Sequence, residues 1–168
     1  MTEAATRSPA AASGTVRWEV RPARTEDAPA VARGVDELLV ELGGTPPARA
    51  AIEAEARAHI EDPSLGIVLV AATGAELVGV LTASWARAIQ VAGRLLTIEV
   101  LWTRREWRDR GVGAALVEEL AAAAAAEGAG RVEVGLPREG FEALRATERF
   151  YLANGFERLG PRMRRSVP

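Results

Sequence analysis

The stretch RREWRDRGVGAAL, Arg104 to Leu116, is the part of the sequence that decides the fold and the first functional hypothesis. A β-rich apolar run, Leu95 to Thr103, precedes it, and an alanine-rich helical pattern follows it. Gly111 and Gly113 stand where that helix should begin, and glycine permits a sharp turn and a close approach of a ligand to the main chain. The first turn of a helix has unpaired N–H groups and a positive dipole end. The stretch therefore predicts a phosphate-binding turn or only a tight turn, and the local pattern alone favours neither.

Length and composition limit the class of protein. The chain has 168 residues, of which 48% are hydrophobic, which is typical of one domain with a real core. We expect residues 1–15 to form a disordered tail and residues 16–168 to form a single domain. No apolar run approaches the ~20 residues of a membrane span. The net charge of −2 gives no global attraction to nucleic acid. We therefore expect a cytoplasmic protein with neither a membrane nor a nucleic-acid partner.

The reactive side chains exclude several chemistries. The chain has no cysteine, so it offers no disulfide, no thiolate nucleophile and no cysteine-based metal site. Its one histidine, His59, lies in a helical pattern, which argues against zinc chemistry and against a Ser-His-Asp triad. All 21 basic residues are arginine, so no lysine can form a Schiff base. We predict no metal site.

Hydrophobic periodicity predicts alternating strands and helices. The predicted strands are Val16–Pro22, Ile67–Ala72, Glu76–Trp85, Leu95–Thr103, Arg131–Leu136, Phe156–Leu159 and Met163–Val167, and the predicted helices run from Thr25 to Leu42, Thr45 to Glu61, Gly111 to Glu127 and Phe141 to Asn154. The short glycine-containing connection Gly74–Ala75 indicates an antiparallel hairpin, and the helix after Gly111 indicates one parallel crossover. The expected fold is a mixed α/β (α+β) sandwich with one parallel strand pair.

Two motifs in this element order resemble those of the GNAT superfamily of acetyl-CoA-dependent N-acetyltransferases. The family pattern Arg/Gln-x-x-Gly-x-Gly/Ala is met by Arg108, Gly111 and Gly113. A helix, a strand and the segment FYLANGF, Phe150 to Phe156, follow in the right order. The resemblance extends from Val16 to about Val167. It implies a central, mostly antiparallel sheet with one splayed parallel pair and helices on both faces.

The resemblance also implies a cofactor site and a catalytic residue. The cosubstrate would be acetyl-CoA, and Tyr151 falls on the family's tyrosine, the usual general acid toward the departing thiolate. Taken alone, Tyr151 fits a core aromatic better. The main chain of Leu101, Trp102 and Thr103 would bind the pantetheine arm and the acetyl carbonyl. The residues that would hold the pyrophosphate are Arg108, Asp109, Arg110, Gly111, Val112, Gly113 and Ala114.

The segment TIEVLWT, Thr97 to Thr103, is similar to the diamine and polyamine N-acetyltransferase branch. Glu99 then matches the general base proposed for that branch, and the alternative is that Glu99 only pairs with a neighbouring arginine. The sequence departs from the family pattern at Arg105, where proline is frequent, and at Leu144, where asparagine is expected. Additional carboxylates for the acceptor would be Glu37 and Glu41, which also fit a solvated helix face.

The resemblance implies transfer of an acetyl group to a primary amine of a small molecule. Because there is no cysteine, we expect direct transfer in a ternary complex. A homodimer is left open. The alternatives are acetylation of a protein N-terminus or an antibiotic amine, a non-catalytic acyl-CoA-binding regulatory domain, and a nucleic-acid binder. The last would use the arginines near Trp102 and Trp107, but Glu106 and Asp109 dilute that patch.

Overall fold

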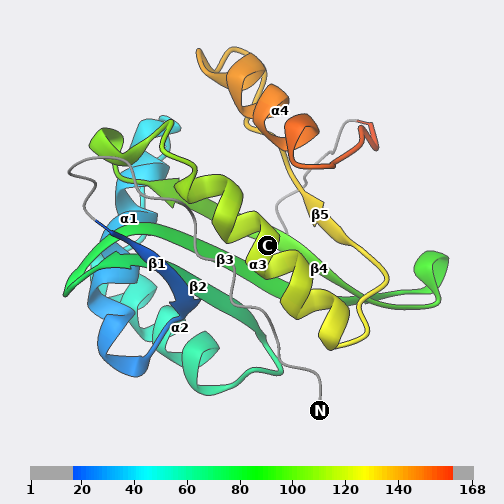
Figure 1. The fold of residues 1–168 in the computed structure, drawn as a ribbon, viewed down its shortest axis with the longest axis horizontal. Helices are drawn as coiled ribbons and strands as arrows, with labels where there is room; N and C mark the ends of the chain where they lie inside the picture. The colour runs from blue at the N-terminus through cyan, green and yellow to red at the C-terminus, as the bar shows by residue number, and fades with distance from the viewer. Residues whose placement is uncertain (1–16, 161–168) are drawn as a thin grey trace.

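The computed structural model describes residues 17–160 and has the expected mixed α/β architecture (Figure 1). The elements in chain order are β1 (Glu19–Pro22), η1 (Thr25–Asp27), α1 (Ala28–Glu41), α2 (Arg49–Glu61), β2 (Gly66–Thr73), β3 (Glu76–Ala88), η2 (Ile89–Val91), β4 (Gly93–Thr103), η3 (Arg105–Trp107), α3 (Val112–Ala126), β5 (Val132–Val134) and α4 (Leu144–Ala153), where η denotes a short 3-10 turn. The predicted tail and the predicted strand Met163–Val167 lie outside the described residues.

The strands form one sheet in the order β1-β2-β3-β4-β5. The first four strands pair antiparallel with their neighbours, which confirms the hairpin predicted between β2 and β3. The last pair is parallel, with Leu96 opposite Val132 and Ile98 opposite Val134. Helix α3 connects these two strands, so the βαβ crossover predicted from the sequence is confirmed.

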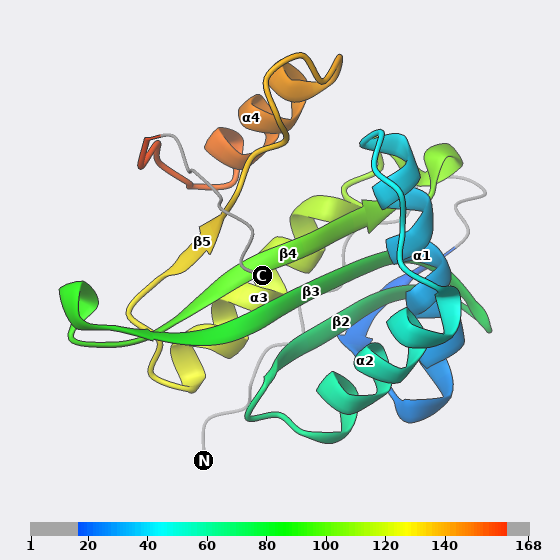
Figure 2. The ribbon, with the colours of Figure 1, turned by 180° about the vertical axis from the view of Figure 1, so that it is seen from behind.

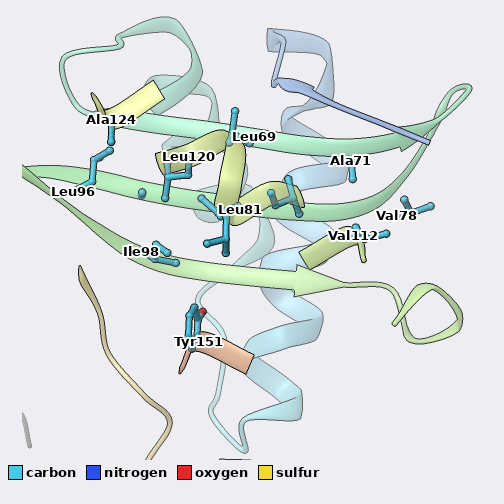
Figure 3. Close-up of a cluster of buried hydrophobic side chains, with 13 residues drawn as sticks. Leu69, Ala71, Val78, Leu81, Leu96, Ile98, Val112, Leu120, Ala124 and Tyr151 are labelled. Carbon is cyan, nitrogen blue, oxygen red and sulfur yellow. The ribbon is translucent and has the colours of Figure 1, made fainter. Parts of the chain in front are cut away.

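Helices cover both faces of the sheet. Figures 1 and 2 show α3 on one face and α1 and α2 on the other, with α4 beside β5. The α3 face buries a cluster that includes Leu69, Leu81, Leu96, Leu116 and Leu120 (Figure 3). The α1 face buries a second cluster that includes Val31, Val70, Val80 and Trp102. Each fully buried leucine contributes about 1.5–3 kcal/mol, so these two layers fix the sheet that carries the site.

A β-bulge interrupts strand β4. Leu101 lies opposite Leu81 and Val100 opposite Thr82, but Ala83 lies opposite Ile98, so Glu99 has no counterpart on β3. An extra residue of this kind shifts the alternation of side chains along the strand. Ile98 accordingly packs in the α3 cluster, whereas Val100 packs against the α1 cluster. The sequence did not predict the bulge.

Some predicted boundaries are wrong. Helix α2 begins at Arg49 rather than Thr45, because Pro47 favours an extended conformation for Pro46. Residues 156–159 form no strand, since no strand of the described chain pairs with them. Strands β3 and β4 instead extend into the predicted loop 86–93, which shrinks to the turn η2.

Candidate active site

A cleft of about 600 Å³ opens where β4 and β5 diverge. Pairing between these strands stops at Ile98 and Val134, while β4 continues to Thr103 along β3 alone. The splay expected between these two strands is therefore present. Main chain and side chains from α1, β4, the loop before α3, the β5–α4 connection and α4 line the cleft.

At the end of β4, the backbone N–H and carbonyl groups of every second residue point toward the cleft. The Arg104 N–H donates to the Val78 carbonyl on β3 (2.9 Å), and the Thr103 carbonyl accepts from Arg108 Nε (3.1 Å) on the other side. Because successive peptide groups of a strand alternate in direction, the N–H groups of Thr103 and Leu101 point toward the open edge. Trp102 turns its N–H toward β3, and its buried indole forms part of the wall.

The glycine loop ends in an uncapped helix N-terminus. Gly111 is the residue that precedes α3, with φ +81°, and Asp109 also has a positive φ of +59°. The first intrahelical bond runs from the Ala115 N–H to the Gly111 carbonyl (3.0 Å). The N–H groups of Val112, Gly113 and Ala114 therefore have no partner within the helix. No described side chain caps them, and all three residues line the cleft. This end of α3 is suited to an anion.

Gly113 allows a close approach between two helices. A Cβ placed on it would lie 3.3 Å from the ring of Phe150 on α4, which is tighter than an ordinary contact. The first turn of α3 and the middle of α4 therefore form one continuous wall of the cleft.

Arg108 binds Glu41 of α1 in a bidentate ion pair. Its Nη1 and Nη2 donate to Oε1 and Oε2 of Glu41 at 2.9 and 2.6 Å. The hydrogen bonds from Arg108 hold the pKa of the Glu41 carboxyl below its usual range, and Glu41 in turn raises the pKa of Arg108. The charge of Arg108 beside the loop is thus already neutralised by α1. Arg110 stacks on Trp107, 5.2 Å from the ring centroid, and does not line the cleft.

Tyr151 projects from α4 toward β4 and lies near Ile98 (Figure 3). It is 7% exposed and packs edge-on against Phe150 and Phe156, with ring centroids 5.2 Å away in both cases. It also borders the cleft. Burial raises the pKa of Tyr151 to about 12, so the phenol keeps its proton at neutral pH.

Glu99 occupies the bulge and also borders the cleft, with an exposed side chain. Among the described residues no salt bridge engages it. Glu37 lies elsewhere, at a second cavity of about 390 Å³. Within residues 17–160, no three or more His, Cys, Asp or Glu side chains gather as a group able to hold a metal ion, and no helix has the length and apolar character needed to cross a membrane.

The family model described as the acetyltransferase (GNAT) family matches residues 34–156, which include all the walls of this cleft. The chain belongs to the GNAT acetyltransferase family. No curated protein matches it significantly.

Solved structures share the GNAT fold at low sequence identity. A possible acetyltransferase from Clostridium difficile 630 has a TM-score of 0.76 at 18% identity, covering 90% of this chain and 97% of that one. A ribosomal-protein-alanine N-acetyltransferase from Brucella melitensis biovar Abortus 2308 has a TM-score of 0.69 at 15% identity, covering 90% and 100%. A predicted acetyltransferase from Clostridium acetobutylicum, solved with acetyl-CoA, has a TM-score of 0.73 at 13% identity, covering 89% and 96%.

The GNAT cleft also has a wall that sequence reasoning missed. Leu38 and Leu42 border it from the α1 side, and Leu136, Pro137 and Phe141 border it from the β5–α4 connection. A Cβ on Gly43 would lie 2.7 Å from a guanidinium nitrogen of Arg138, so these two segments touch at the rim. The only signal in the sequence was the apolar character of these residues.

Proposed function

We propose that this GNAT protein transfers an acetyl group from acetyl-CoA to a primary amine of a small molecule, directly within a ternary complex. The observation that carries the proposal is the meeting of three features in one cleft. These are the open edge of β4, the uncapped N-terminus of α3 and the buried phenol of Tyr151. The structural neighbour solved with acetyl-CoA supports the choice of donor.

The residues present fit a CoA thioester. The pyrophosphate would accept hydrogen bonds from the N–H groups of Val112, Gly113 and Ala114, which lack intrahelical partners. The outward N–H groups of Leu101 and Thr103 would donate to carbonyl oxygens of the pantetheine arm and of the acetyl group, as an added strand accepts from an edge strand. Bound there, acetyl-CoA supplies the activated acetyl group.

Deprotonation of the acceptor is the first chemical requirement. An aliphatic amine with a pKa near 10.4 is protonated at pH 7, so its nucleophilic form costs about 4–5 kcal/mol. We assign the proton acceptor as Glu99, acting directly or through water, because its carboxylate borders the cleft at the bulge. The nitrogen–carbon bond then forms as the carbon–sulfur bond breaks, and the second proton that the nitrogen loses to water balances the one that Tyr151 gives to the sulfur. A backbone N–H at Leu101 or Thr103 would stabilise the charge that develops on the carbonyl oxygen.

Tyr151 is assigned to the departing sulfur. Its pKa of about 12 keeps the hydroxyl protonated, so it is always available as a donor. Full proton transfer to a thiolate with an ordinary pKa near 8.5 is uphill by about 3.5 units. We therefore assign Tyr151 a hydrogen bond that strengthens as charge builds on sulfur, with the proton completing its transfer as the product leaves.

Two other acceptors are carried as alternatives. Acetylation of a protein N-terminus has a structural neighbour in the ribosomal-protein-alanine N-acetyltransferase. A diamine or polyamine acceptor is the alternative suggested by the similarity of the segment around Glu99 to the diamine and polyamine N-acetyltransferase branch. A non-catalytic acyl-CoA-binding domain would have no use for a protonated phenol inside the cleft.

Thiol release from acetyl-CoA tests the proposed reaction with little background, because the chain contains no cysteine that would react with the thiol reagent. The full chain is assayed with a panel of amines, and CoA binding is measured separately by calorimetry. For Tyr151→Phe we expect kcat to fall by roughly 10²-fold or more while the dissociation constant for CoA stays within about twofold. Binding of acetyl-CoA without thiol release on any amine would instead identify a non-catalytic domain. Unchanged turnover in Tyr151→Phe would remove the phenol from the mechanism.

A further inference from the structure

The charges that line the cleft limit the kind of amine it can accept. Three acidic residues border it: Glu41, Glu99 and Asp109. Both carboxylate oxygens of Glu41 are bound by Arg108. Asp109 belongs to the loop before α3, on the side assigned to the donor phosphates. Among the residues that the structure describes, Glu99 is therefore the one cleft carboxylate left for an ammonium group.

The two end segments outside the described residues have little acid to add. Residues 1–16 contain one acidic residue, Glu3, and residues 161–168 contain none, but three arginines. At the rim, the guanidinium of Arg138 lies against Gly43. Among the described residues that line the cleft, no further carboxylate is left for a second positive charge on an acceptor.

The walls beyond Glu99 are apolar. Leu38 and Leu42 come from the end of α1, and Leu136 and Phe141 come from the β5–α4 connection. Leu136 is 42% exposed, so a large apolar side chain stands open to solvent at the edge of the cleft. An uncharged hydrocarbon body would cover this surface favourably, whereas an ammonium group placed there would lose hydration without gaining a partner.

From the single available carboxylate and these walls we infer that the acceptor is a primary amine with one positive charge on an apolar body, and not a diamine or polyamine. The inference rests on the proposed function and narrows its substrate class. Glu99 takes the reacting ammonium, and the leucine and phenylalanine side chains take the hydrocarbon body.

The test compares hexylamine with 1,6-diaminohexane, which have the same chain length and differ by the second ammonium group. In the thiol-release assay we expect kcat/KM to be roughly tenfold or more higher for hexylamine. An equal or higher value for the diamine would overturn the inference while leaving the proposed acetyl transfer intact.

Two variants test whether the apolar wall causes the preference for hexylamine over the diamine. Leu136→Glu adds a carboxylate to the apolar wall and should shift the ratio of the two kcat/KM values toward the diamine by about threefold. Leu152→Glu is the matched control, because Leu152 is 38% exposed on α4 and does not border the cleft. The same ratio in both variants would contradict the assigned wall.

A binding measurement distinguishes failure of the proposed acetyl transfer from failure of the inference about the acceptor. If no amine releases thiol, the affinities of hexylamine and diaminohexane for the CoA-loaded protein are compared by calorimetry. Tighter binding of hexylamine would then support the acceptor class without turnover, and equal binding would refute it.

Discussion

Replacing Gly111 by alanine separates the fold from donor binding. Gly111 has φ +81°, and a Cβ there would meet no atom within 4 Å, so the cost is conformational and not steric. An L-residue in the left-handed region loses about 1–2 kcal/mol. Gly128, just beyond the end of α3, has φ +72° and equally open surroundings but does not border the cleft. Both variants should therefore lower Tm by roughly 2–8 °C.

Only Gly111→Ala should weaken CoA binding. Its methyl group, or the loop rearrangement that relieves it, disturbs the N–H groups at the start of α3. An anion at a helix N-terminus is stabilised by up to about 2 kcal/mol, so the Kd measured by calorimetry should rise by roughly 5- to 30-fold. Gly128→Ala should keep the wild-type Kd. Equal Kd values for the two variants would refute the placement of the pyrophosphate on this helix end.

Two further predictions concern ionisation. Tyr151 is the only tyrosine, so phenolate absorbance should titrate in one step near pH 12. The folded state holds this proton more tightly than the unfolded state, so the free energy of unfolding should fall by about 3 kcal/mol as pH rises from 10 to 12. A step near pH 10 would contradict its burial. Glu41→Gln should cost at most about 1 kcal/mol in urea unfolding at pH 7, since Arg108 and Glu41 are 37% and 34% exposed. Because the pKa of Glu41 is lowered, this difference should disappear as pH falls through that pKa, and a difference that persists in acid would point to packing instead.

The sequence predicted best what depends on neighbouring residues. The turn at Gly111 and the helix of Tyr151 follow from local motifs, and both lie at the cleft. The Glu41–Arg108 ion pair joins residues 67 positions apart, so no local pattern could indicate it. Arg108 was expected to face the phosphates, and its pairing with α1 appeared only in the folded chain.

The bulge was hidden for a different reason. Apolar residues stand at every second position from Leu96 to Trp102, which predicts one shared face for all of them. The bulge instead places Ile98 and Val100 on opposite faces, and both faces of β4 are covered, so either arrangement buries apolar side chains. The apolar acceptor wall was missed because Leu136 and Phe141 come from a connection whose path depends on where β5 stops.

The bulge at Glu99 gives one position two independent properties. Its side chain supplies a carboxylate, and its backbone unit sets the phase of everything that follows on β4. Substitution changes the first property alone. If Glu99 paired regularly and the bulge were lost, Val100, Leu101, Trp102 and Thr103 would exchange faces, so that an indole now buried beneath α1 would point at α3. Removal of the residue would instead leave these four side chains on their present faces. The bulged conformation at this point of the strand is therefore as much a part of the cleft as the identity of any side chain in it.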